Sequence, residues 1–201
     1  SHQTVIVLDF GGQYNQLIAR RVRECNVYCE VMPCTTPLSQ LKAMDPIGII
    51  FTGGPNSVYL DSSPHVDPEI FTWGVPILGI CYGCQLMAHT LGGQVTEAQD
   101  DSAREYGKTQ TYYDTTSPLF KGLPQEGISW MSHGDYMAKV PDGFALTAHS
   151  DSCPNVAIAD EARGFYGVQF HPEVNHTQHG IDMIHNFLYE VCRAKGDWTM
   201  E

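Results

Sequence analysis

Residues 76–93, PILGICYGCQLMAHTLGG, join two unlike patterns. Ile77–Ile80 is a short apolar run, which is typical of a buried strand. Gln85–Leu91 consists mainly of good helix formers and stops at two glycines. Cys81 stands at the join, with one glycine two residues before it and another two residues after it. The stretch therefore predicts a strand that turns directly into a helix, with a thiol at the turn.

The pattern Gly-x-nucleophile-x-Gly between a strand and a helix is the signature of a nucleophile elbow. Its glycines give the strand and the helix room to approach each other closely. The side chain then projects beyond the carboxyl ends of parallel strands, where open α/β sheets place their sites. Cys81 is therefore a candidate nucleophile, and the backbone amide of Tyr82 is a candidate donor to an oxyanion. The alternative is a tight turn around a buried thiol.

The first half of the chain alternates apolar runs with amphipathic segments. We expect strands at Thr4–Leu8, Tyr28–Met32, Ile47–Phe51 and Ile77–Ile80, and helices at 13–24, Pro37–Met44 and around Pro68–Trp73. This alternation predicts an α/β fold with an open, mostly parallel or mixed sheet and helices on both faces.

After residue 94 the pattern changes to short strand candidates separated by turns. They are Lys108–Tyr113, Ile128–Met131, Phe144–His149, Val156–Ala159 and Phe165–Phe170. We expect them to form a meander or a mixed edge of the sheet. A last helix is expected at Gly180–Cys192, with Ile181, Ile184, Phe187, Leu188 and Val191 facing inward.

A thiol nucleophile needs a base, and the base needs a group that orients it. Among nine histidines, His171 is the best candidate, because it follows the apolar run that ends at Phe170 and precedes Pro172. Glu173 could accept a hydrogen bond from the imidazole and fix its tautomer. The sequence thus predicts a Cys81–His171–Glu173 triad. The alternative for this segment is an ordinary surface loop.

A second oxyanion donor is expected from the glycines that follow the third strand. Gly53-Gly54-Pro55 comes directly after the predicted strand that ends at Phe51. That strand should neighbour the strand before Cys81, so glycine amides there could approach a substrate oxygen. An ordinary loop turn is the alternative.

The bulk composition limits the classes of function. The 201 residues are enough for one domain with a core, and their net charge of −12 argues against nucleic acid as a partner. The sequence shows neither an apolar run of about 18 residues nor a signal peptide, so we expect no membrane partner. Seven cysteines without a secretory signal favour a reducing, cytoplasmic setting. Cys25, Cys29 and Cys34 lack metal-ligand spacing, and we expect no metal.

With these pieces in view, the sequence resembles class I glutamine amidotransferases, most of all the glutaminase domains of GMP synthases. The resemblance extends over residues 4–192 and is carried by LDFGGQYNQLIARRVRE (8–24), TGGPNSVY (52–59), GICYGCQ (79–85), WMSHGD (130–135) and GVQFHPEV (167–174). It departs from the usual pattern at Gly12 and Asn15, where such enzymes often carry Ser and Thr, and at Cys84, where Met is more usual.

The resemblance implies hydrolysis of L-glutamine to glutamate and ammonia through a glutamyl thioester on Cys81, with His171 and Glu173 completing the triad. It implies an oxyanion hole formed by the amides of Gly54 and Tyr82. It places glutamine against Gln85 and the segment Ser132-His133-Gly134-Asp135. His133 could instead belong to a face for another domain, and Arg20, Arg21 and Arg23 are expected to form a solvated helix face.

The ammonia is expected to serve an ATP-dependent synthetase that converts XMP to GMP. We expect residues 1–192 to form the amidotransferase domain and 193–201 to be a truncated linker, with Trp198 exposed, toward an ATP-pyrophosphatase domain absent from this chain. ATP and Mg²⁺ would be needed only there, and no cofactor is expected in the amidotransferase domain itself. Three alternatives remain: an amidotransferase for anthranilate or carbamoyl phosphate synthesis, a γ-glutamyl hydrolase or other thiol peptidase, and an inactive docking or regulatory module.

Overall fold

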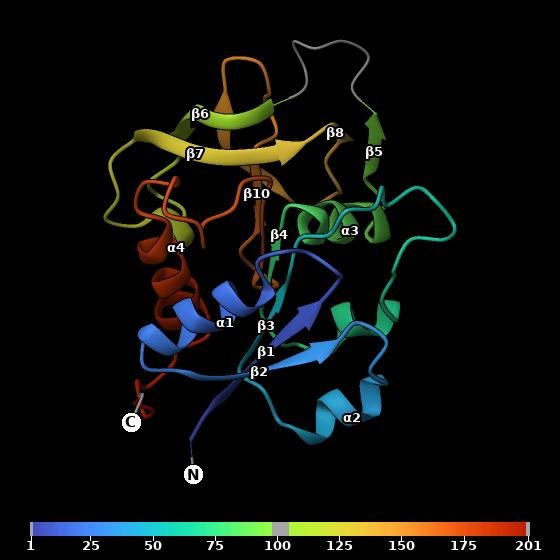
Figure 1. Cartoon of the computed structure of the whole chain (residues 1–201), viewed down its shortest axis with the longest axis vertical. Helices are drawn as coiled ribbons and strands as arrows, with labels where there is room; N and C mark the ends of the chain where they lie inside the picture. The colour runs from blue at the N-terminus through green and yellow to red at the C-terminus, as the bar shows by residue number, and fades with distance from the viewer. Residues whose placement is uncertain (1, 98–104, 200–201) are drawn as a thin grey trace.

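The computed structural model describes residues 2–97 and 105–199, apart from the side chains of Glu105, Tyr106 and His133. Nine strands form one mixed sheet in the order β2-β1-β3-β4-β11-β10-β9-β6-β7 (Figure 1). Five of these strands run parallel to one another: β2 (Tyr28–Pro33), β1 (Thr4–Asp9), β3 (Gly48–Phe51), β4 (Ile77–Ile80) and β11 (Phe165–Val168). The sequence prediction of a mostly parallel, mixed α/β sheet is confirmed.

The remaining strands of this sheet are antiparallel to one another. They are β10 (Ala157–Asp160), β9 (Ala145–Ser150), β6 (Glu105–Tyr113) and β7 (Glu126–His133), and β10 pairs with β11 at the boundary between the two halves. A separate ribbon pairs β5 (Gln94–Glu97) with β8 (Asp135–Lys139). The sequence patterns did not predict β5 or β8, because both strands are short and each buries a single side chain, Val95 and Met137 respectively.

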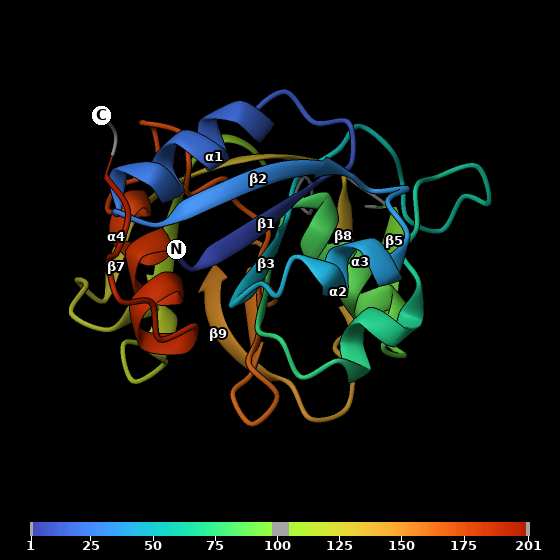
Figure 2. The ribbon, with the colours of Figure 1, turned by 90° about the horizontal axis from the view of Figure 1, so that it is seen from below.

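Helices cover both faces of the sheet, and each face has its own apolar core (Figure 2). Helices α1 (Asn15–Glu24) and α4 (Gly180–Asn186) pack on one face, and the π-helical turn η4 (Phe187–Val191) continues α4. Helices α2 (Leu38–Ala43) and α3 (Tyr82–Thr90) and the 3₁₀ turn η1 (Pro68–Thr72) pack on the other. A second 3₁₀ turn, η3, spans Pro118–Phe120. No helix in the described residues is long and apolar enough to cross a membrane.

Three sequence predictions about the helices and the C-terminal tail are wrong in detail. Ile181 was expected to face inward but is 42% exposed, because α4 buries Met183 and Ile184 instead. Helix α1 begins at Asn15 rather than at residue 13. Trp198 is not left exposed by the tail: it is half-buried, and its ring centroid lies 5.8 Å from that of Tyr28.

Candidate active site

The backbone at Cys81 is held in a conformation that L-residues rarely adopt. Its φ of 53° and ψ of −109° fall directly between β4 and α3. Its amide donates to the Val168 carbonyl at 2.8 Å, so the turn is fixed to the end of β11. The neighbouring strand pairing and the first turn of α3 hold this strained residue in place, as at many functional sites. The sulfur is thereby presented at the carboxyl edge of the parallel strands.

The two glycines around Cys81 are required by close approach of backbone to backbone. A Cβ at Gly79 would lie 2.7 Å from the carbonyl oxygen of Gly83, and a Cβ at Gly83 would lie 2.5 Å from that of Phe51. Both distances are shorter than real Cβ contacts. The glycines therefore let α3 start directly against β3 and β4, as the elbow pattern predicts.

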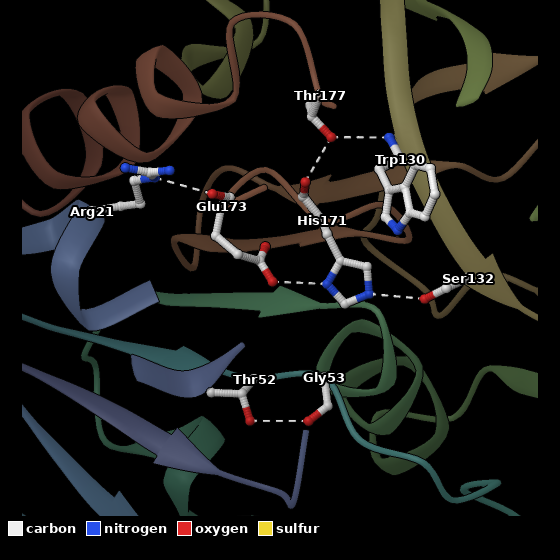
Figure 3. Close-up of polar contacts among 8 residues, drawn as sticks. All are labelled: Arg21, Thr52, Gly53, Trp130, Ser132, His171, Glu173 and Thr177. Atoms are coloured by element: carbon white, nitrogen blue, oxygen red, sulfur yellow. Dashed lines mark hydrogen bonds and ion pairs between the residues drawn. The ribbon is translucent and has the colours of Figure 1, made fainter. Parts of the chain in front are cut away.

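His171 reaches the same place from the end of β11. Strands β4 and β11 are parallel with Ile80 opposite Val168, so the residues that follow them emerge at the same edge of the sheet. The His171 Nδ1 atom lies 2.8 Å from Glu173 Oε2, and both side chains are buried (Figure 3). The structure thus brings Cys81, His171 and Glu173 together.

Electrostatics around His171 favour its protonated form. Burial alone would lower the pKa of the imidazole, but the side-chain contacts with Cys81 and Glu173 outweigh this and raise it to about 10. The imidazole is therefore mostly a cation at neutral pH. Nearby Cys84 differs, because complete burial raises the pKa of its thiol far above the ordinary value and keeps it neutral.

The loop that carries Glu173 is anchored from two directions (Figure 3). Arg21 of α1 donates from Nε to the Glu173 carbonyl at 3.0 Å and from Nη2 to Asn175 Oδ1 at 3.1 Å. Thr177 Oγ1 donates to the His171 carbonyl at 2.6 Å and accepts from the Trp130 amide at 2.9 Å. The prediction that Arg21 belongs to a solvated face is wrong, because its partners lie about 150 residues away, beyond any local pattern.

The backbone amides near Cys81 differ in whether they have a backbone acceptor in the described part of the chain. The amides of Gly83 and Gln85 donate to the carbonyls of Thr52 and Cys81, respectively. No backbone acceptor in the described part of the chain takes the amides of Gly54 or Tyr82. Both residues line a cavity beside the sulfur, so they stand where an oxyanion hole is predicted.

That cavity, called the α3 cavity below, measures about 290 Å³ and includes all four predicted glutamine-contact residues: Gln85, Ser132, Gly134 and Asp135. Gln85 Nε2 donates to Gln169 Oε1 at 3.1 Å. The Asp135 carboxylate accepts from Ser57 Oγ at 2.7 Å and from the Tyr59 hydroxyl at 3.4 Å. Ser132 Oγ lies 3.2 Å from His171 Nε2, so its hydroxyl faces the imidazole. The side chain of His133 lies outside the described part of the chain.

A second cavity, called the α1 cavity below, opens on the other side of Cys81. It measures about 310 Å³ and lies between residues 11–15, the start of α1, and the side chains of Trp130, His171 and Glu173. The two cavities share only Gly54, Pro55, Cys81 and Ser132 among their lining residues. The sulfur therefore sits at the junction of two cavities. A sequence pattern cannot reveal this, because β7, α1 and β11 contribute to the walls together.

The fold and this site define a class: α/β proteins with a cysteine on a strand–helix elbow beside a buried histidine–glutamate pair. The chain belongs to the class I glutamine amidotransferase family, because the family model for glutamine amidotransferase class-I matches residues 6–191.

The curated relatives with similar sequences are glutamine-hydrolysing GMP synthases. The chain is 57% identical over 197 residues to the glutamine-hydrolysing GMP synthase of Caldicellulosiruptor saccharolyticus, covering 98% of this chain and 38% of that protein. It is 56% identical over 200 residues to that of Finegoldia magna, covering 100% of this chain and 39% of the relative. The chain thus spans less than half the length of the curated relatives it matches.

Solved structures agree with the fold. A candidate GMP synthase component from Thermoplasma acidophilum superposes with a TM-score of 0.85 at 32% identity, covering 96% of this chain and 95% of that one. A glutamine amidotransferase from Thermotoga maritima gives a TM-score of 0.76 at 17% identity, over 96% of this chain and all of that one, and supports the fold alone.

Proposed function

We propose that this chain hydrolyses L-glutamine to glutamate and ammonia with Cys81 as nucleophile, His171 as acid and base, and Glu173 as the group that orients His171. The observation that carries the proposal is the meeting of these side chains at one edge of the sheet, with the strained backbone of Cys81 presenting its sulfur. The 2.8 Å contact between His171 and Glu173 holds the imidazole with Nε2 toward the sulfur and Ser132.

The reaction begins when the Cys81 sulfur attacks the side-chain carbonyl carbon of glutamine. The developing negative oxygen accepts hydrogen bonds from the amides of Gly54 and Tyr82, and the support for this role is that both residues line the cavity beside the sulfur. His171, held as a cation, donates the proton at Nε2 to the departing nitrogen. Ammonia leaves, and a glutamyl thioester on Cys81 remains.

Hydrolysis of the thioester completes the cycle. The neutral imidazole of His171 removes a proton from water, which attacks the thioester carbonyl carbon and releases glutamate. Glu173 accepts the hydrogen bond from His171 Nδ1 and stabilises the imidazole in its cationic form.

We place the amino-acid end of glutamine in the α3 cavity. The Asp135 carboxylate can pair with the substrate ammonium group, and the Gln85 side chain lines the wall next to it. Ser132 lies in β7 and Asp135 begins β8, so the junction of these two strands forms one wall of the substrate space.

We further propose that the ammonia serves an ATP-pyrophosphatase synthetase that converts XMP to GMP in the cytoplasm. The support is the 56–57% identity to glutamine-hydrolysing GMP synthases, of which this chain matches 38–39%. Residues 193–201 would lead toward that synthetase, which would bind ATP and Mg²⁺, whereas the chemistry proposed for this domain uses only its own side chains and amides.

The test is glutamine hydrolysis combined with active-site labelling. Purified chain should release ammonia from free glutamine, and a glutamine-mimicking electrophile should modify Cys81. Cys81→Ala should abolish both, whereas Cys84→Ala, which removes a fully buried thiol in the next turn, should retain labelling. The assignment would be overturned if labelling persisted in Cys81→Ala. It would also be overturned if the wild-type chain, before any labelling, released no ammonia from glutamine.

A further inference from the structure

The segment that begins at His171 is attached to the outer edge of β7. This strand is the last in the order of the nine-stranded sheet, and its inner edge pairs with β6. The His171 amide donates to the Trp130 carbonyl at 2.9 Å, and the Gln178 amide donates to the Ile128 carbonyl at 2.8 Å. The chain therefore leaves the edge of β7 after His171 and returns to it at Gln178.

The Thr177 hydroxyl closes the base of this loop (Figure 3). Its Oγ1 atom donates to the His171 carbonyl at 2.6 Å and accepts from the Trp130 amide at 2.9 Å. Together with the bond from the His171 amide to the Trp130 carbonyl, these contacts form a closed ring of hydrogen bonds. Thr177 is buried, so removal of its hydroxyl leaves a buried donor and a buried acceptor without their partner.

Strand β7 also carries Ser132, two residues beyond Trp130. Side chains two residues apart lie on the same face of a strand, so the ring that fixes Trp130 also fixes the position of Ser132. Ser132 Oγ lies 3.2 Å from His171 Nε2, and both residues line the α1 cavity beside Cys81. A slip between β7 and His171 would therefore displace Nε2 from its neighbours.

We propose that Thr177 is a positioning residue for the reaction, because its hydroxyl fixes the His171 imidazole relative to β7 and the Cys81 sulfur. This inference rests on the glutaminase function proposed above. Thr177 belongs to neither set of described residues that line the two cavities. Its contribution is therefore to the geometry of proton transfer rather than to the binding of glutamine.

The test compares two variants, Thr177→Val, which removes the hydroxyl and keeps the branched shape, and Thr177→Ser, which keeps the hydroxyl. Thr177→Val should lower kcat for glutamine hydrolysis about tenfold, because the His171 amide still holds its own bond to β7. The KM of this variant should stay within about twofold, and Thr177→Ser should keep kcat within about threefold. Each kcat is divided by the number of sites that a glutamine-mimicking electrophile labels, so unfolded chain is not counted.

The pH profile separates a loss of position from a loss of stability. Burial lowers the pKa of His171, whereas contacts with Cys81 and Glu173 raise it, so a displaced imidazole should lose its proton more readily. The alkaline limb of the kcat profile should therefore lie at lower pH in Thr177→Val than in the wild-type chain. Thr177→Ser should keep the wild-type limb.

The matched control is Gln178→Leu, which also removes a side-chain acceptor from an amide of β7. Gln178 Oε1 accepts from the Ile128 amide at 2.8 Å, two residues before Trp130 and on the side away from Ser132. This change should leave both kcat and the alkaline limb as they are in the wild-type chain.

Three results would overturn the proposal. They are a Thr177→Val kcat within about twofold of the wild-type value, a Thr177→Ser kcat as low as that of Thr177→Val, and a Gln178→Leu loss as large as that of Thr177→Val. If Thr177→Val leaves no site to label, Thr177→Ala takes its place under the same limits. A wild-type chain that releases no ammonia would instead remove the glutaminase function itself.

Discussion

The parallel and antiparallel halves of the sheet contribute different things to the site. Strands β3, β4 and β11 end at one edge, and the residues directly after them supply Gly54, Cys81 and His171. Strand β7 of the antiparallel half supplies Ser132, and the neighbouring β5–β8 ribbon supplies Asp135; both residues line the α3 cavity. The comparison teaches that the parallel half carries the chemistry and the antiparallel half, with this ribbon, carries substrate contacts. Changes in the first should therefore alter kcat, and changes in the second should alter KM.

The largest effect is expected from Glu173→Gln, because it removes the charge that holds the His171 cation. Loss of a triad carboxylate should lower kcat by about 10³-fold with little change in KM for glutamine. Steady-state glutaminase assays measure both constants, and Glu161→Gln, a change at an exposed position, is the control. A variant that keeps most of its kcat would remove Glu173 from the mechanism.

Next in size is Gly83→Ala, which tests whether the elbow depends on backbone contact. The new Cβ would lie 2.5 Å from the Phe51 carbonyl oxygen, so the free energy of unfolding should fall by about 1–3 kcal/mol. Gly127→Ala in β7 of the antiparallel half is the comparison. Its new Cβ would meet only side-chain atoms, the nearest being Gln178 Oε1 at 3.3 Å, so the free energy of unfolding should fall by less than about 1 kcal/mol. Urea denaturation compares the two; equal losses would contradict a special role for the elbow.

Asp135→Asn, in the β5–β8 ribbon, tests the substrate contacts. Loss of the charge beside Gln85 should raise KM for glutamine about tenfold and leave kcat within about twofold, because a charge-assisted contact with the substrate ammonium is weakened. Asp142→Asn, at an exposed position further along the chain, should change neither constant. A fall in kcat with unchanged KM would instead assign Asp135 to the chemistry.

The last prediction concerns the pH dependence of stability. The folded chain holds the His171 proton with a pKa of about 10, whereas the unfolded chain releases it near the ordinary value of 6.5. The folded state therefore binds more protons between these values, and this contribution to stability is present below about pH 6.5 and lost as pH rises toward 10. The difference in melting temperature between the wild-type chain and His171→Gln should therefore shrink as pH rises from about 6.5 to 10. A difference that stays constant over this range would contradict the raised pKa of His171.

Much of the fold could be predicted because its elements have strong local patterns. The runs Thr4–Leu8 and Ile77–Ile80 are continuous and apolar, and both are strands in the structure. Strands β5 and β8 were missed because Gln94–Glu97 and Asp135–Lys139 are short and each buries only one side chain, Val95 and Met137, which lie opposite each other in the ribbon. Ile181 is exposed although Ile184, Phe187 and Leu188 of the same predicted face are buried, because it lies in the first turn of α4, at the end of that face.

The same division holds within the site. The sequence alone determined that Cys81 sits on a forced turn between glycines and that His171 and Glu173 follow a buried strand, because each depends on neighbours a few residues away. Only the tertiary structure decided that Arg21 holds the Glu173 loop, that Ser132 faces His171, and that two cavities meet at the sulfur. These contacts join residues tens to more than a hundred positions apart, and their geometry is set by how the strands pack and not by any local preference of the chain.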